Sequence, residues 1–234
     1  MRFDIITIFP KIFDSYFNES IVKRAREKKL IDICVHDLRK FTSDKHKKVD
    51  DRPFGGGVGM VFKPEPLALA IDSILKRVLK SEKHRAKIIL FSAAGKQFSA
   101  KTAVDFSRKY NHIIMIAGHY EGVDERIGKI VSDFGFRSPG IALAKPGVSD
   151  LSIGPYVLTG GELPAMVVLD AVARQIPGVL GKTESLEEKR HGIGVPVYTR
   201  PEVFEFKNKK YRVPKVLLSG DHKKISVWRT SKAK

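Results

Sequence analysis

The chain has 234 residues, 42% of them hydrophobic, and its 43 lysines and arginines exceed its 26 acids to give a net charge of +17. No uncharged apolar stretch approaches the roughly 18 residues of a membrane helix, and the single cysteine, Cys34, excludes a disulfide framework or a cysteine-based zinc site within one chain. The positive charge favours a nucleic acid as partner, with a solvated basic surface as the alternative. The N-terminus carries an acid at once and lacks a secretory cleavage pattern, so we expect a cytoplasmic protein with no membrane association.

The first half of the chain alternates short apolar runs with helical patterns, which predicts an α/β fold with a parallel sheet. The predicted strands are rich in Ile and Val and cover residues 2–9, 31–37, 87–91 and 112–117. The predicted helices have apolar residues at helical spacing. They cover residues 18–28 or 20–28, 64–80, 100–110 and 123–131. Residues 38–63 are polar, basic and rich in glycine, and long loops of this kind are usually functional.

The second half begins with a helix over residues 163–176 that is apolar nearly all round, which indicates burial, with a second subunit as one candidate partner. The composition then becomes highly charged, so we expect three parts: a main domain over residues 1–178, a linker over 179–199 and a short C-terminal segment over 200–234. The last part is too short for its own core, and Asp221 marks the start of its one clear helix.

Two glycine motifs fail as nucleotide sites. The run at 55–59 (GGGVG) lacks the strand and distal acid of a dinucleotide fingerprint, and Gly181-Lys182-Thr183 lacks the first glycine of a phosphate-binding loop. Three other glycine-containing segments, at 91–95, 117–122 and 152–162, each lie where a strand is expected to end. Open α/β sheets bind ligands at these ends, so the three predict one shared pocket, although each alone could be a simple tight turn.

Six motifs, in order, cover most of the chain: residues 50–60 (DDRPFGGGVGM), 118–126 (GHYEGVDER), 152–166 (SIGPYVLTGGELPAM), 174–181 (RQIPGVLG), 198–203 (YTRPEV) and 216–222 (VLLSGDH). Together they resemble the bacterial tRNA (guanine-N1)-methyltransferase family. The resemblance implies a SPOUT fold, in which the α/β sheet is tied into a deep trefoil knot, and a small helical C-terminal segment. It also implies a homodimer that methylates N1 of guanosine 37, 3′ to the anticodon of tRNA, with S-adenosylmethionine and an associated Mg²⁺ ion.

Residue roles follow from the same motifs. The expected cofactor-binding residues are Ser92, Gly95, Gly118, Tyr120, Glu121, Ser152, Ile153, Gly154, Pro155, Tyr156, Val157, Leu158, Gly160 and Gly161. The expected tRNA-binding residues are His46, Asp50, Arg52 and Gly59. Arg174 matches the arginine that contacts the target guanine, whereas an ordinary ion pair with Asp170 is its structural alternative. Glu121 has a comparable alternative as an acid at the start of the helix over 123–131.

The sequence departs from the family pattern at three places that bear on the site. Residues 135–150 form an extra segment, Pro155 stands where an acid is common, and Lys189 stands where the family carries its catalytic aspartate. Removal of the guanine N1 proton needs a carboxylate, so we expect Glu188 to be the general base, with Glu187 as its rival. Two other functions stay open: a related SPOUT RNA methyltransferase with another target base, and a noncatalytic RNA-binding protein of the same fold.

Overall fold

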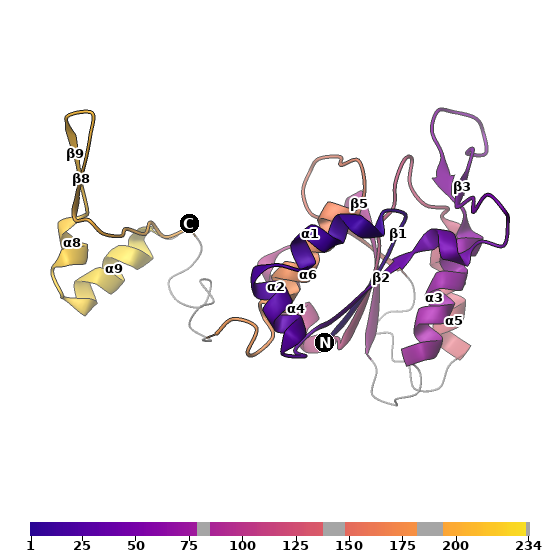
Figure 1. Ribbon diagram of the computed structural model, residues 1–234, viewed down its shortest axis with the longest axis horizontal. Helices are drawn as coiled ribbons and strands as arrows, with labels where there is room; N and C mark the ends of the chain where they lie inside the picture. The colour runs from indigo at the N-terminus through magenta and orange to yellow at the C-terminus, as the bar shows by residue number, and fades with distance from the viewer. Residues whose placement is uncertain (79–84, 138–147, 182–193, 233–234) are drawn as a thin grey trace. The chain divides into compact units, whose positions relative to one another are not determined.

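Short apolar segments of the first 152 residues form a five-stranded, fully parallel sheet with the order β2-β1-β6-β5-β7. The computed structural model describes residues 1–78, 85–137, 148–181 and 194–232, and it divides into two compact units, Met1–Val179 and Leu180–Lys234 (Figure 1). The strands of the large sheet are β1 (Arg2–Thr7), β2 (Asp32–Asp37), β5 (Ala86–Gln97), β6 (His112–Ile116) and β7 (Val148–Ser152). The α/β prediction and the presence of its four strands are thereby confirmed, and β7 is the strand that was expected to end at the segment 152–162, for which no range was predicted.

Helices cover both faces of this sheet (Figure 1). One face packs against η1 (Pro10–Phe13), α1 (Asp14–Phe17), α2 (Ser20–Glu27), α4 (Ala100–Lys109) and α6 (Glu162–Ala173). The other face packs against η2 (Leu38–Phe41), α3 (Pro64–Val78) and α5 (Arg126–Arg137). Two short strands, β3 (Asp50–Asp51) and β4 (Val61–Phe62), pair antiparallel within the predicted loop.

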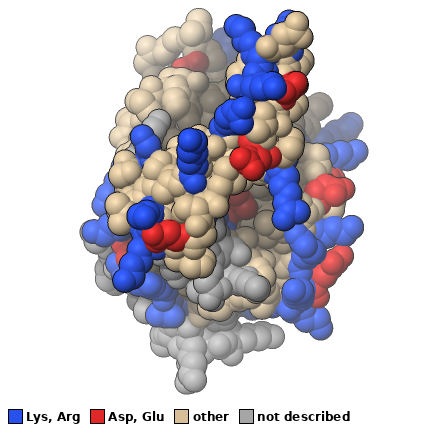
Figure 2. All heavy atoms as spheres, turned by 90° about the vertical axis from the view of Figure 1, so that its left-hand side faces the viewer, with Lys and Arg blue, Asp and Glu red and all other residues tan. Residues whose placement is uncertain are grey.

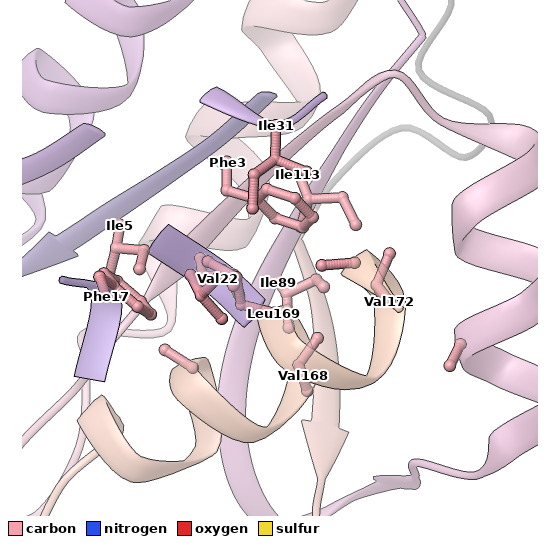
Figure 3. Packing of buried hydrophobic residues seen from close by; sticks show 14 of the residues in the cluster. Phe3, Ile5, Phe17, Val22, Ile31, Ile89, Ile113, Val168, Leu169 and Val172 are labelled. Atoms are coloured by element: carbon pink, nitrogen blue, oxygen red, sulfur yellow. The ribbon is translucent and has the colours of Figure 1, made fainter. Parts of the chain in front are cut away.

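The core of the first face joins the sheet to α6 (Figure 3). Phe3 and Ile113 on neighbouring strands are fully buried, and Val168, Leu169 and Val172 of α6 are buried with them. Because side chains alternate across a strand, the intervening residues of β1 and β6 face the other core, which α3 and α5 cover. α6 is thereby held with its N-terminus near the carboxyl ends of the strands, since Gly161, which precedes it, donates a backbone hydrogen bond to Gly118 O.

A buried carboxylate links the three strands β2, β1 and β6. Asp4 is fully buried and accepts hydrogen bonds from Arg2 Nε at 2.6 Å, His36 Nε2 at 2.5 Å and His112 Nε2 at 2.7 Å. Burial alone would raise the pKa of Asp4, but the hydrogen bonds from His112, His36 and Arg2 outweigh it and hold the pKa far below its usual range. Asp4 therefore remains ionised in the folded protein at neutral pH.

The described residues of the second unit form a hairpin and two helices. Its elements are β8 (Val203–Phe206), β9 (Lys209–Arg212), α8 (Lys215–Leu218) and α9 (His222–Lys232). The helix expected after Asp221 is confirmed as α9, whereas the hairpin was not predicted. Most of the expected linker lies at residues 182–193, outside the described part of the chain. No helix among the described residues is long and apolar enough to cross a membrane.

Candidate functional site

A pocket of about 290 Å³ lies where β5, β6 and β7 reach the carboxyl edge of the sheet. Its walls come from the bulge of β5 around Ser92, the loop 117–123 after β6 and the loop 153–161 between β7 and α6. The structure thus brings the three glycine-containing segments together, as the sequence predicts. Parallel strands place such loops side by side because all of them end at the same edge.

Twelve of the fourteen residues expected to bind the cofactor line this pocket: Ser92, Gly118, Tyr120, Glu121, Ser152, Ile153, Gly154, Tyr156, Val157, Leu158, Gly160 and Gly161. Gly95 and Pro155 do not line it. Pro155 is exposed within the loop 153–161. Ser152 shapes the same loop from inside, because its buried hydroxyl donates to Gly154 O at 2.8 Å and accepts from Gly154 N at 3.2 Å.

Gly95 has a structural part in forming this wall. The prediction that the strand ends at residue 91 is wrong, because β5 continues to Gln97 with a shift in its pairing with β7 between Phe91 and Lys96. The bulged residues leave the ladder, and Ser92 is thereby turned toward the pocket. A Cβ atom at Gly95 would stand 2.6 Å from Leu151 N, so only glycine lets the two backbones pass so closely.

A hydrogen-bonded set at the base of the pocket was missed by sequence reasoning. His119 lines the pocket, and its Nε2 donates to Oε2 of Glu162 at 2.7 Å. Glu162 is only 4% exposed, and its Oε1 accepts from the hydroxyl of Thr7 at 2.5 Å. His119 and Glu162 lie in two of the six motifs, which was the available signal, but Thr7 is 155 positions from Glu162 and only the fold reveals their contact.

The pocket has the opposite charge to the chain as a whole. Glu121, Glu125 and Asp150 contribute to its walls, and none of the described residues that line it is lysine or arginine. The whole chain carries a net charge of +17, and Lys and Arg are spread over the face drawn in Figure 2. Acidic residues in the lining favour a ligand that carries positive charge near these carboxylates.

Glu121 joins the pocket to the glycine-rich loop. A Cβ atom at Gly59, where φ is +87°, would stand 2.5 Å from Glu121 Oε1, so this glycine permits both the backbone turn and the close approach. Glu121 N also donates to Met60 O at 3.1 Å. The alternative role of Glu121 at the start of a helix is wrong, because α5 begins only at Arg126.

The other residues expected to bind tRNA lie along the same loop, outside the pocket. Asp50 is paired with Phe62 in the small β3–β4 sheet, and Arg52 follows it with an exposed side chain. His46 lines a separate depression with Lys48 and Lys63. The structure therefore places Gly59 beside Glu121, which lines the pocket, whereas Gly59, His46, Asp50 and Arg52 do not themselves line it.

Of the two expected catalytic residues, the structure describes Arg174. Arg174 follows the last residue of α6 and does not line the pocket, whereas the residues around Gly161 at the other end of this helix do. At 1.5 Å per residue, the 12 positions from Glu162 to Arg174 span about 18 Å. Asp170, one turn before Arg174, lies beside Tyr16, and burial together with this charge raises the pKa of the Tyr16 phenol. Glu188, Glu187 and Lys189 lie outside the described residues.

Comparison with known proteins agrees with the motifs. The model of the tRNA (Guanine-1)-methyltransferase TrmD family matches residues 1–234. A tRNA (guanine-N(1)-)-methyltransferase of Dictyoglomus turgidum is 45% identical over 236 residues, covering 100% of this chain and 85% of the relative. Proteins with the same name from Clostridioides difficile (45%; 98% and 90% covered) and Geobacter sulfurreducens (43%; 100% and 86% covered) are similar over comparable lengths. The chain belongs to the tRNA (guanine-1)-methyltransferase family.

Proposed function

We propose that this chain transfers the methyl group of S-adenosylmethionine to N1 of guanosine 37, the nucleoside 3′ to the anticodon of tRNA. Its membership of the family over the whole length supports the reaction and the substrate. The observation that carries the proposal is the acidic pocket at the carboxyl edge of the sheet, built from the loops that hold the family's motifs. A sulfonium cofactor carries the positive charge that such a lining favours.

The residues of the pocket fit this cofactor. Leu90, Ile153 and Leu158 offer apolar contacts for a purine ring, while Gly118 and Gly160 leave backbone groups open to close approach. Glu121 is placed to attract an ammonium or sulfonium group. Magnesium has less support, because no three His, Cys, Asp or Glu side chains group to hold a metal within the described residues. We assign magnesium no site among the residues that the structure describes.

The chemistry assigned to the protein is proton removal and charge stabilisation. Guanine N1 carries a proton, and a carboxylate within hydrogen-bond reach, proposed to be that of Glu188, accepts it as the methyl group is transferred. Negative charge then develops on O6 of the guanine. The guanidinium of Arg174 stabilises this charge with paired N–H donors, a contribution on the order of 3 kcal/mol to the barrier. S-adenosylmethionine, when bound, supplies the methyl group on its sulfonium.

The length of α6 indicates which subunit supplies the arginine. Gly161 and Pro164 at the start of this helix line the pocket, whereas Arg174 follows its end, about 18 Å further along. A guanidinium reaches only a few ångströms from its own backbone, so Arg174 cannot meet a base that receives a methyl group from the pocket of the same chain. We therefore propose that each site combines the pocket of one subunit with Arg174 of the other.

The exposed side of α6 supports such a homodimer. Leu163 is 58% exposed and Val167 is 46% exposed, and they lie one turn apart on the same side of the helix. Val157, in the neighbouring loop of the pocket, is also exposed. Neighbouring exposed apolar residues of this kind are typical of an interface between subunits, and a two-fold axis would cover them in both copies at once.

Two further features are proposed from the family alone. We expect the chain to form a trefoil knot, although general topology rules argue against knots. The close packing of Gly161 against Ala117 and of Gly95 against Leu151 is compatible with such a path, because it joins the loops in which a knot would be tied. A cytoplasmic location follows from tRNA as the proposed substrate.

Transfer of labelled methyl groups from S-adenosylmethionine to a tRNA transcript tests the function. Nuclease digestion should then release 1-methylguanosine from position 37 and no other labelled nucleoside. A label on another nucleoside would favour a related RNA methyltransferase with a different target. Tight binding of the cofactor and tRNA without transfer would instead favour a noncatalytic RNA-binding protein.

A further inference from the structure

The β8–β9 hairpin of the second unit carries three aromatic residues on one of its two faces. In the register of this hairpin, Phe204 pairs with Tyr211 and Phe206 pairs with Lys209. Residues that face each other across an antiparallel pair share a face, and residues two apart on one strand share it too. Phe204, Phe206, Tyr211 and Lys209 therefore lie together, and we call them the aromatic face.

The rings form a flat and accessible surface. Phe204 and Phe206 have ring centroids 6.3 Å apart and planes only 10° from parallel, and the Tyr211 ring lies 6.4 Å from that of Phe204. Each of the three residues is 54% exposed. Cross-strand aromatic pairs stabilise a hairpin, but that role does not require leaving more than half of each residue in contact with water.

The turn holds this surface in place. Lys207 and Asn208 have φ values of +48° and +58°, the positive values at both central residues that a two-residue type I′ turn requires. Such a turn fixes the register of the two strands and hence the side on which each ring lies. The ammonium of Lys207 is 5.5 Å from the centroid of the Phe206 ring.

Both faces of the hairpin carry charged residues: Glu205, Lys210 and Arg212 lie on one, and Lys209 lies on the aromatic face. Glu205 lies on the opposite face, where its Oε1 is 2.9 Å from Nζ of Lys210. Lys209 lies on the aromatic face, and Lys207 extends over its edge. The aromatic face thus combines exposed rings with a cationic margin, which are the two features that bind single-stranded nucleic acid.

We propose that the aromatic face stacks against unpaired nucleobases of the tRNA substrate, with Lys207 and Lys209 contacting the adjacent phosphates. The proposal rests on the proposed function in taking tRNA as the RNA that is bound. Every nucleobase has a π-face, so stacking of this kind tolerates different sequences. The positive charge beside the rings complements the phosphates that flank each stacked base.

The test compares two RNA probes with the full-length chain: an anticodon stem-loop, which has unpaired bases, and a continuous duplex with the same number of phosphates. Phe206→Ile removes the flat ring but keeps a residue that favours strands. This variant should raise the Kd for the stem-loop at least about 5-fold and leave the Kd for the duplex unchanged. Phe206→Trp restores a ring and should restore the affinity, with its fluorescence quenched by the stacked base. Val203→Thr, on the opposite face, is the matched control and should change neither Kd.

Three results would overturn the proposal. Unchanged binding of the stem-loop by Phe206→Ile, or equal weakening for both probes, would remove base stacking from the hairpin. Dissociation of the dimer by Phe206→Ile in sedimentation would show that a second copy of the chain covers the rings. Methyl transfer by the wild type distinguishes the two proposals. If the wild type methylates guanosine N1 and Phe206→Ile binds both probes normally, only the stacking proposal fails. Loss of stem-loop affinity with no methyl transfer by the wild type would defeat only the proposed function.

Discussion

A dimer that carries two different defects tests whether the pocket and Arg174 belong to different subunits. Arg174→Ala removes the guanidinium and, on its own, should lower turnover by roughly 10²-fold, the equivalent of about 3 kcal/mol, while cofactor binding stays intact. Ala93→Trp places a large ring at a residue that lines the pocket of about 290 Å³. Calorimetry on this variant alone should show that S-adenosylmethionine binding is lost.

The expected activity of the mixed dimer follows from the length of α6. If about 18 Å separates Arg174 from the pocket of its own chain, a dimer of one Arg174→Ala chain and one Ala93→Trp chain has one intact site and one doubly defective site. Co-expression with two different affinity tags isolates this dimer. Its methyl transfer to tRNA should reach about half that of the wild-type dimer, whereas each variant homodimer stays nearly inactive.

A site completed within one subunit predicts a different activity for the mixed dimer. If Arg174 served the pocket of its own subunit, both sites of the mixed dimer would be defective and its turnover would not exceed that of the two homodimers. That result, obtained with a dimer shown to be intact by sedimentation, would refute the reasoning from the helix length.

Other perturbations give equally direct outcomes. Glu188→Gln should lower methyl transfer by roughly 10²-fold or more without weakening tRNA binding. Near-normal turnover by Glu188→Gln, together with loss of turnover in Glu187→Gln, would assign the role of base to Glu187. Val167→Asp should convert the dimer to a monomer in sedimentation, because it places a charge on the exposed apolar side of α6. The affinity for tRNA should fall with salt by slightly less than one logarithmic unit per unit of log salt for each neutralised phosphate, and an affinity indifferent to salt would contradict an electrostatic contribution. Asp4→Ala should cost about 3–5 kcal/mol of unfolding free energy at pH 7 in urea titrations. Because the folded pKa of Asp4 is depressed, its contribution is present above the unfolded value of about 3.9 and is lost below it, so Asp4→Asn should flatten the acid limb of stability against pH.

Local sequence patterns were sufficient to predict the parallel sheet and most of the helices that pack against it. The apolar run of β6 and the helical spacing of α3 reflect burial on one side of a layer, and this information is contained in neighbouring residues. The convergence of the three glycine-containing segments followed in the same way, because the ends of parallel strands meet at one edge.

Features that depend on distant partners were not predictable. β5 continues past its expected end because β7 pairs with it again at Lys96, and nothing near Phe91 in the sequence signals this second contact. The contact of Thr7 with Glu162 likewise joins opposite ends of the first unit. The β8–β9 hairpin was missed for another reason, since its turn uses Lys207 at a positive φ, where glycine or asparagine is the usual signal.

The acidic lining of the pocket has a consequence for the end of each reaction cycle. Methyl transfer turns the sulfonium of the donor into an uncharged thioether, while Glu121, Glu125 and Asp150 keep their negative charges. The part of the attraction that comes from the sulfonium is therefore lost once the methyl group has left, while the attraction to the ammonium remains. The pocket should therefore bind the methylated cofactor more tightly than the demethylated product. Methyl transfer itself would in this way promote release of the product and binding of the next cofactor molecule.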